Sequence, residues 1–208
     1  ILGSNIANIL LILGCTAYIS PLLIQKRSLL KDLPFSMFIV LLTLILIISS
    51  GIPYTLETWH SVILLSLFII YILRLIKVNT NITEKKNKIG LTNAIFEFII
   101  GILALPIGAK AVINGATSIS QLLQIPESII ALFAIALGTS LPELVTSIIA
   151  AKRQKHDMVI GNIIGSNIFN IVFVLSICGL IKPLSFNIMF IHDIGTILFA
   201  STLLFIVA

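Results

Sequence analysis

Long apolar runs separated by short polar connections dominate this chain. The runs lie in seven stretches, near residues 3–24, 33–52, 58–76, 93–123, 125–151, 158–181 and 194–208. A helix of about 20 apolar residues is long enough to cross a hydrocarbon core of about 30 Å. We therefore expect an all-α, polytopic membrane protein whose seventh run is short for a complete span.

Composition and charge support this expectation. Of the 208 residues, 58% are hydrophobic and 10% are charged, whereas soluble domains have about 25% charged residues. The net charge of +5 does not indicate a nucleic-acid partner, because the loops after the odd-numbered runs hold 11 of the 13 Lys and Arg residues. The positive-inside rule then orients the odd-numbered spans from outside to inside. We expect a multi-pass plasma (inner) membrane protein in contact with the lipid bilayer.

A polar phrase occurs twice within the apolar runs. GSNIANILLILGCTAYISPL (3–22) and GSNIFNIVFVLSICGLIKPL (165–184) agree at ten of 20 positions without a gap. The copies lie in the first and sixth spans, so they must cross the membrane in opposite directions. Further along, KDLPF (31–35) and HDIGT (192–196) each hold an Asp expected to cap the following helix. Inverted repeats of this kind are typical of secondary transporters.

The repeat divides the chain into three parts. We expect the rest of a first inverted repeat at 1–76, a basic cytosolic linker at 77–92, and a second inverted repeat at 93–208. The chain begins inside an apolar run without Met, and its last run is short. We therefore expect a piece of a longer protein, with the first repeat truncated at its start and the second at its end.

The fifth run contains an acidic residue in an unusual helix. In ALGTSLPELVTSIIA (136–150), Pro142 removes the helical partner of the Gly138 carbonyl, and Glu143 is the only acidic residue deep inside an apolar run. Placing a carboxylate inside a membrane costs free energy, so such a residue is by default a candidate functional group. Thr139 and Ser140 precede Glu143 by four and three residues, which places their oxygens near one helical face. The alternative is a structural carboxylate that is hydrogen-bonded to Ser or Thr.

The repeated phrase supplies further oxygen atoms. Ser4 and Asn8 are four residues apart, as are Ser166 and Asn170, so each pair projects from one helical face. Gly161 and Gly165 have the same spacing and are expected to let another backbone approach. Plain helix packing explains a single such motif, but its repetition in inverted halves favours a shared site. Hydroxyl, amide, backbone and carboxylate oxygens suit Na⁺ or Ca²⁺, whereas zinc and copper prefer thiols or imidazoles.

These residues also resemble a known family. GTSLPELVTSIIAAKRQKHDMVIGNIIGSNIFNI (138–171) closely resembles the second alpha repeat of the Na⁺/Ca²⁺ exchanger (cation/Ca²⁺ antiporter) superfamily, and GSNIANILLILG (3–14) resembles the end of its first. The resemblance is strong over 1–22 and 138–184. It implies a fold of ten helices in two inverted halves, of which this chain would hold helices three to nine, and the short linker indicates a prokaryotic-type membrane domain.

The resemblance also implies an activity and a set of ligands. The activity is alternating-access exchange in which Na⁺ influx drives Ca²⁺ efflux, with no cofactor and no obligatory protein partner. Matching the family's motifs assigns ion binding to Ser4, Asn8, Thr139, Ser140, Glu143, Ser166 and Asn170, and to the backbone carbonyl of Ala136 for Na⁺. The acidic GTSxPE phrase of the first half is expected upstream of Ile1, so we expect the 208-residue chain alone not to transport.

Three alternatives stay open. A cation/H⁺ antiporter of the same fold would couple Ca²⁺ to protons, and some relatives carry Asp at the position of Asn170, which leaves the counter-ion undecided. A passive cation channel predicts rings of like residues in a symmetric oligomer rather than a pseudo-symmetric site in one chain. An intramembrane enzyme is disfavoured, because the sequence has no GxSxG motif and no Ser, His and acid together at membrane depth.

Overall fold

The structure, a computed structural model, describes residues 1–78, 91–123 and 127–207. Within the described helices, some side chains lie outside the description, among them those of Ala136 and Thr139. The chain forms two compact units, which are described separately. The first combines Ile1–Leu73 with Glu143–Ala208, and the second is Arg74–Pro142. The first unit thus contains both copies of the repeated phrase.

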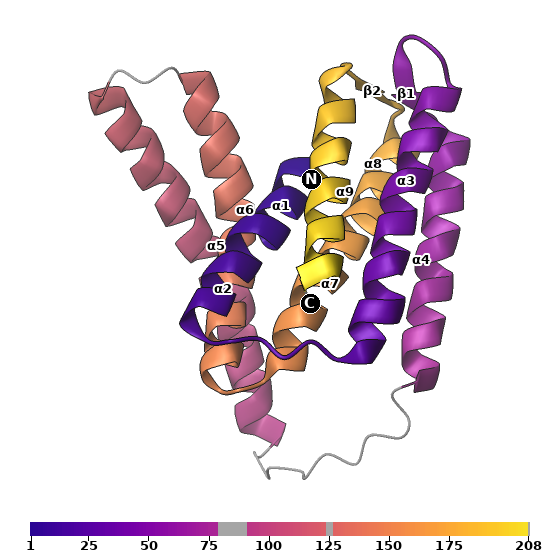
Figure 1. The fold of residues 1–208 in the computed structure, drawn as a ribbon. Coiled ribbons are helices and arrows are strands. Elements are labelled where there is room, and N and C mark those ends of the chain that lie inside the picture. The colour runs from indigo at the N-terminus through magenta and orange to yellow at the C-terminus, as the bar shows by residue number, and fades with distance from the viewer. Residues whose placement is uncertain (79–90, 124–126, 208) are drawn as a thin grey trace. The chain divides into compact units, whose positions relative to one another are not determined.

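The first half of the larger unit begins with one membrane-length helix. It consists of α1 (Leu2–Ala7), the π-helical segment η1 (Asn8–Ile12) and α2 (Leu13–Ile19). A second helix follows as η2 (Ser28–Asp32), also π-helical, and α3 (Leu33–Ser49). The short strand β1 (Tyr54–Leu56) leads into α4 (Thr58–Val78) (Figure 1).

The second half begins in the same way, with a long helix that has a π-helical interruption. After the end of α6 (Glu127–Lys152) come α7 (His156–Phe169), the π-helical segment η4 (Asn170–Leu175) and α8 (Ser176–Ile181). The strand β2 (Leu184–Phe186) and the helix α9 (Met189–Val207) complete the unit. Both halves therefore hold a helix with a π-helical interruption, an irregular connection and a second long helix.

Hydrogen bonds between the connections show that the two halves run in opposite directions. The Gln25 side chain, after α2, donates to Asp157 Oδ2 at the start of α7, at 2.6 Å. Gln154 donates to Ser20 Oγ at 3.3 Å. The end of the first helix therefore lies beside the beginning of its repeat, which confirms the inverted orientation expected from counting spans.

At the other end of the unit the two halves share a small sheet. β1 and β2 are antiparallel, with Tyr54 opposite Phe186 and Leu56 opposite Leu184. Gly179, just before β2, lies so close to Ser61 at the start of α4 that an added Cβ would collide with the Ser61 hydroxyl. α8 therefore approaches α4 closely at this glycine.

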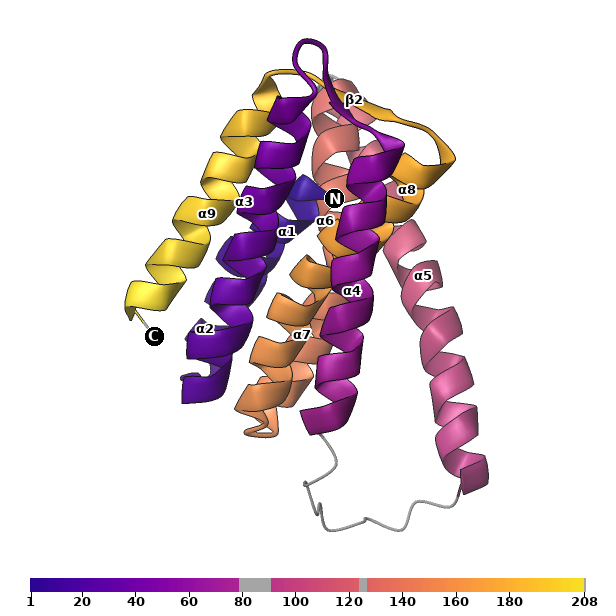
Figure 2. The same cartoon turned by 90° about the vertical axis from the view of Figure 1, so that its right-hand side faces the viewer.

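The helices of this unit pack around an aliphatic core. α9 lies beside both α3 and α1 (Figures 1 and 2). Ile12, Ile39, Ile168 and Ile194 are at most 1% exposed. Burial of such branched side chains contributes about 1.5–3 kcal/mol each. Packing of the two halves therefore stabilises the unit that carries both repeated phrases.

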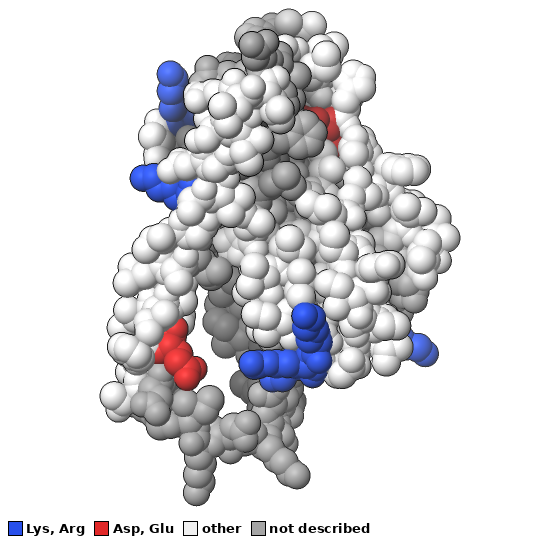
Figure 3. Space-filling model, turned by 90° about the vertical axis from the view of Figure 1, so that its left-hand side faces the viewer, with Lys and Arg blue, Asp and Glu red and all other residues white. Residues whose placement is uncertain are grey.

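The outer surface is that of a membrane protein. Within the described residues, five helical segments are long and apolar enough to cross a membrane: Leu2–Ile19, Ser28–Ser49, Thr58–Ile76, His156–Ile181 and Met189–Val207. Many large apolar side chains on them are exposed, including Tyr18, Ile45 and Phe199. Charged side chains are sparse on the face shown in Figure 3. The expectation of a multi-pass membrane protein is confirmed.

The smaller unit contains α5 (Leu91–Leu122) and the first part of α6. Gly138 lies against the side chain of Ile113, because a Cβ added at this glycine would be 2.6 Å from Ile113 Cδ1. α6 continues through Pro142 without interruption. The loss of a helical hydrogen bond expected at Gly138 and Pro142 does not interrupt the helix. Gly138 is instead a position of close contact with α5.

The expected aspartate caps are wrong. Asp32 is the last residue of η2 and makes no side-chain capping bond to α3. Asp193 lies inside α9, which begins at Met189. The preceding stretches, SLLK (28–31) and MFIH (189–192), contain neither Gly nor Pro, so they extend each helix upstream of its aspartate.

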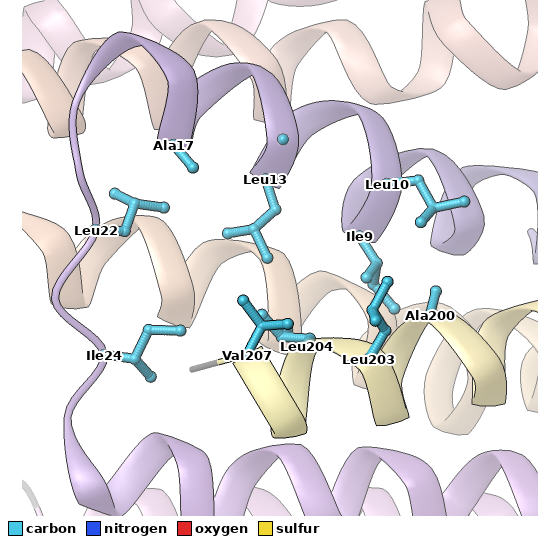
Figure 4. A pocket seen from close by; sticks show the side chains of 11 residues that line it. Ile9, Leu10, Leu13, Ala17, Leu22, Ile24, Ala200, Leu203, Leu204 and Val207 are labelled. Atoms are coloured by element: carbon cyan, nitrogen blue, oxygen red, sulfur yellow. The ribbon is translucent and has the colours of Figure 1, made fainter.

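An apolar groove runs along α9 (Figure 4). It encloses about 400 Å³ and is lined by Ile9, Leu10, Leu13, Gly14, Ala17, Leu22, Ile24, Ala200, Leu203, Leu204 and Val207. Leu10 is 49% exposed there, whereas Val172, its counterpart in the other repeat, is fully buried. The lining offers no polar side chain, so this groove does not suit a cation.

Candidate cation site

The two GSNxxN phrases lie directly against each other in the larger unit. Asn5 of α1 donates from Nδ2 to the backbone carbonyl of Asn167 in α7, and Asn167 Nδ2 donates to the carbonyl of Asn5. Both distances are 3.3 Å. The two side chains are 0% and 3% exposed, respectively. The repeat in the sequence is therefore a reciprocal, pseudo-two-fold pair in the structure.

The outer asparagines extend the same symmetry. Asn8 Nδ2 donates to Asn167 Oδ1 at 2.8 Å, and Asn170 Nδ2 donates to Asn5 Oδ1 at 2.9 Å. Each outer asparagine is thus held by the inner asparagine of the opposite half.

The serines take equivalent places in this network. Asn8 Nδ2 is 3.1 Å from Ser166 Oγ, and Asn170 Nδ2 is 3.5 Å from Ser4 Oγ. Each hydroxyl donates to a carbonyl three residues back on its own helix, Ser4 to Ile1 and Ser166 to Ile163. The structure therefore brings together four of the predicted ligands, two from each repeat.

One buried oxygen atom of this cluster has no hydrogen-bond partner among the described residues. Asn8 is 1% exposed, and within the described residues its buried Oδ1 accepts no hydrogen bond. An unsatisfied buried polar atom costs about 1–3 kcal/mol, and native proteins contain few of them. A bound cation would satisfy this oxygen.

The helix geometry changes at the outer asparagines in both halves. η1 begins at Asn8 and η4 begins at Asn170, which are equivalent positions of the repeat. A π-helical turn shifts the backbone hydrogen-bond register and is frequently found at functional sites. The change in register therefore occurs at the same two residues that the sequence assigns to ion binding.

Glu143 joins the larger unit through its backbone. Asn162 of α7 directs Nδ2 at the Glu143 carbonyl, at 3.4 Å, and at Thr146 Oγ1 and Ser147 Oγ, both at 3.1 Å. Glu143 Oε2 is buried and has no hydrogen-bond partner among the described residues. The alternative of a structural carboxylate bonded to Ser or Thr receives no support at this oxygen.

The remaining predicted ligands belong to the smaller unit. Ser140 is 3% exposed, and its Oγ has no partner in the described part of the chain. The side chains of Thr139 and Ala136 lie outside the described residues. Their assignment to the site stays a prediction.

Two features differ from the sequence-based expectations. No close backbone contact occurs at Gly161 or Gly165, because an added Cβ would meet nothing within 4 Å at either position in the described structure. The close contact between the repeats is made at Asn5 and Asn167 instead, since paired amides hold the helices together there. Asn162 was also missed as a contact residue, although it stands in the same GNxxGSNxxN phrase.

The oxygen set is one that suits a hard cation. Across the described ranges, no group of three or more His, Cys, Asp or Glu side chains could hold a metal ion. Hydroxyl and amide oxygens, together with one carboxylate, are the candidate ligands. Such oxygens suit Ca²⁺ and Na⁺ rather than transition metals.

Comparison with known proteins identifies the family. The sodium/calcium exchanger protein family matches residues 1–77 and 93–208. The chain belongs to this family of membrane cation exchangers. The match covers both halves and omits the linker expected between them.

Relatives and solved structures agree with this assignment. The chain is 34% identical over 197 residues to the inner membrane protein YrbG of Escherichia coli, covering 88% of this chain and 59% of that protein. It is 36% identical over 186 residues to the uncharacterized membrane protein MJ0091 of Methanocaldococcus jannaschii, covering 88% of this chain and 60% of that protein. A structure of the sodium-calcium exchanger NCX_Mj matches with a TM-score of 0.80 and 34% identity, covering 99% of this chain and 66% of that chain. The 208 residues thus span about three fifths of the two membrane proteins.

Proposed function

We propose that the full-length protein is a secondary active transporter that exchanges Na⁺ for Ca²⁺ across the membrane by alternating access. Its ion site would use the side chains of Ser4, Asn8, Thr139, Ser140, Glu143, Ser166 and Asn170 and the carbonyl of Ala136. Family membership supports an exchanger, and the sodium-calcium exchanger NCX_Mj supports the choice of ions.

The orphaned amide oxygen of Asn8 carries this proposal. It is buried where the two inverted repeats meet, beside the hydroxyl of Ser166. Secondary transporters with inverted repeats bind their substrates at such a repeat interface. A carbonyl-type oxygen without a hydrogen-bond donor is an unfavourable group in a packed core and a favourable ligand for Ca²⁺ or Na⁺.

The hydrogen-bonded contact also suits alternating access. The reciprocal Asn5 and Asn167 bonds fix the point at which the two halves cross. In inverted-repeat transporters, access alternates as one part rocks or gates around a fixed site. A central contact that stays intact would keep the ligands of both repeats together while the surrounding helices move.

Ion flux in liposomes tests this proposal. The full-length protein is reconstituted into vesicles loaded with Na⁺, and uptake of ⁴⁵Ca is followed after dilution into Na⁺-free buffer. We expect uptake that requires the outward Na⁺ gradient and stops when a Na⁺ ionophore dissipates it. Uptake driven by a pH gradient alone would identify a cation/H⁺ antiporter, and gradient-independent Ca²⁺ equilibration would identify a channel. Either outcome would overturn Na⁺/Ca²⁺ exchange.

A further inference from the structure

We infer that Asn5 and Asn167 are positioning residues, which determine that Asn8 and Asn170 present their amide oxygens, not their amide hydrogens, to the cation. This inference rests on the proposed function. Neither residue is among the predicted ligands. Both are nearly inaccessible and use their side chains entirely within the contact between the repeats.

Two backbone carbonyls fix the direction of the whole network. A carbonyl oxygen only accepts hydrogen bonds, so the Asn167 atom that faces the Asn5 carbonyl must be Nδ2. The other arm of the Asn167 amide is therefore the acceptor Oδ1. Asn8 can approach that acceptor at 2.8 Å only with its own Nδ2. The Asn8 amide oxygen is consequently turned away from Asn167, and it is the buried atom that has no partner.

The same chain of constraints operates in the opposite half. Asn5 Nδ2 faces the carbonyl of Asn167, so Asn5 Oδ1 is the acceptor that faces Asn170. Asn170 must then direct Nδ2 at Asn5, which turns its Oδ1, the other branch of the amide, away from Asn5. The orientation of each proposed ligand is thus set by a residue of the opposite repeat.

This arrangement requires a hydrogen-bond donor at positions 8 and 170. An ionised carboxylate has no hydrogen to donate, so at position 170 it would place an oxygen against Asn5 Oδ1. Side chains that orient metal ligands commonly change metal affinity by about 10–100-fold when they are mutated. Asn5 and Asn167 stand in this relation to Asn170 and Asn8.

Equilibrium Ca²⁺ binding to the full-length protein tests the inference. Asn167→Leu keeps the branched shape of the side chain but can neither donate nor accept, and it leaves the backbone carbonyl of residue 167 free to receive Asn5. We expect it to raise the Kd for Ca²⁺ by about 10–100-fold. Combined with Asn8→Leu, it should add nothing to the effect of Asn8→Leu alone, because Asn167 acts through Asn8. Combined with Asn170→Leu, the two effects should multiply, because Asn170 is held by Asn5.

A structural role would give a different pattern. If Asn167 only stabilised the fold, its effect would multiply with both partner variants equally, and this result would overturn the inference. Unchanged Ca²⁺ affinity in Asn167→Leu would also overturn it. If that variant does not fold, Asn167→Ser takes its place in the same double-mutant comparisons. A serine side chain is too short to reach both Asn8 and the Asn5 carbonyl.

The matched control is Thr43→Val. Thr43 is 1% exposed and donates to the Ile39 carbonyl of its own helix, and this bond is not part of the hydrogen-bond network of the four asparagines. We expect this variant to retain the wild-type Kd, whereas a rise equal to that of Asn167→Leu would count against a specific positioning role. Failure of the wild-type protein to bind Ca²⁺ would instead refute the proposed function, so the two failures are distinguishable.

Discussion

Asn8 of the first repeat donates its amide to Asn167 of the second repeat at 2.8 Å, across 159 positions of the chain. The equivalent bond runs from Asn170 back to Asn5 at 2.9 Å. Each half of the molecule therefore orients a proposed ligand that the other half supplies. A cation site built this way exists only when both repeats are folded against each other.

The outer asparagines should contribute similarly to ion binding. We expect Asn8→Leu and Asn170→Leu each to weaken Ca²⁺ binding to the full-length protein by about tenfold or more. The reason is that Ca²⁺ is coordinated by about six to eight oxygen atoms, and each substitution removes one of them. Isothermal titration of detergent-solubilised protein measures the affinities. Asn187→Ala, at an exposed position outside the network, is the control and should bind as the wild type does. Wild-type affinity in both ligand variants would contradict the assignment.

Removing the intramembrane charge should stop exchange. Glu143→Gln keeps the size of the side chain but removes the negative charge that offsets a divalent cation. We expect Na⁺-dependent ⁴⁵Ca uptake by proteoliposomes to fall to background, with the protein still folded by size-exclusion chromatography. Glu97→Gln alters an exposed carboxylate near the start of α5 and should retain uptake. Transport by Glu143→Gln at the wild-type rate would show that Glu143 is structural.

The contact at Gly179 should be intolerant of a side chain. A Cβ at this position collides with the Ser61 hydroxyl and approaches Leu56 at 3.1 Å, so Gly179→Val would force α8 away from α4 and β1. We expect a loss of stability of about 1–3 kcal/mol, as in other overpacked cores. Thermal unfolding in detergent measures it. Gly195→Ala is the control because a Cβ there meets nothing within 4 Å, and equal melting temperatures for the two variants would refute this packing account.

The inverted topology predicts opposite accessibility of two loops. Cys15 and Cys178 are free cysteines, so both are first replaced by alanine. In that background Glu57→Cys should react with a membrane-impermeant maleimide from outside intact cells, and Lys155→Cys should react only after the membrane is opened. The reason is that the positive-inside rule predicts a cytosolic location for the basic loops. Labelling of both positions from the same side would exclude the proposed orientation.

Much of this architecture follows from the sequence because each signal is local. The lengths of the apolar runs predict the helices. The positions of the two GSNxxN copies, in the first and sixth spans, predict that the two repeats cross the membrane in opposite directions. The observed helices start and end within a few residues of the expected spans, and Gln25 and Asp157 meet as the inversion requires.

The contacts between the repeats could not be predicted in this way. The spacing of Ser4 and Asn8 places both on one helical face, but it does not say which atoms face the opposite repeat. The reciprocal bonds of Asn5 and Asn167 depend on how close two helices pack, which is a property of the folded unit. For the same reason, the sequence suggested a close approach at Gly161 and Gly165, whereas the structure places it at the asparagines.

Locating the cation is the most direct test of the central claim that the two repeats form one site. Crystals of the full-length protein are soaked in Sr²⁺, a heavier substitute for Ca²⁺, and its position is found by anomalous diffraction. We predict a peak at the contact between the repeats, within about 2.3–2.8 Å of Asn8 Oδ1, with Asn170, Ser4, Ser166 or Glu143 oxygens completing the shell. A Sr²⁺ peak only at positions remote from Asn8 and Asn170 would contradict the account.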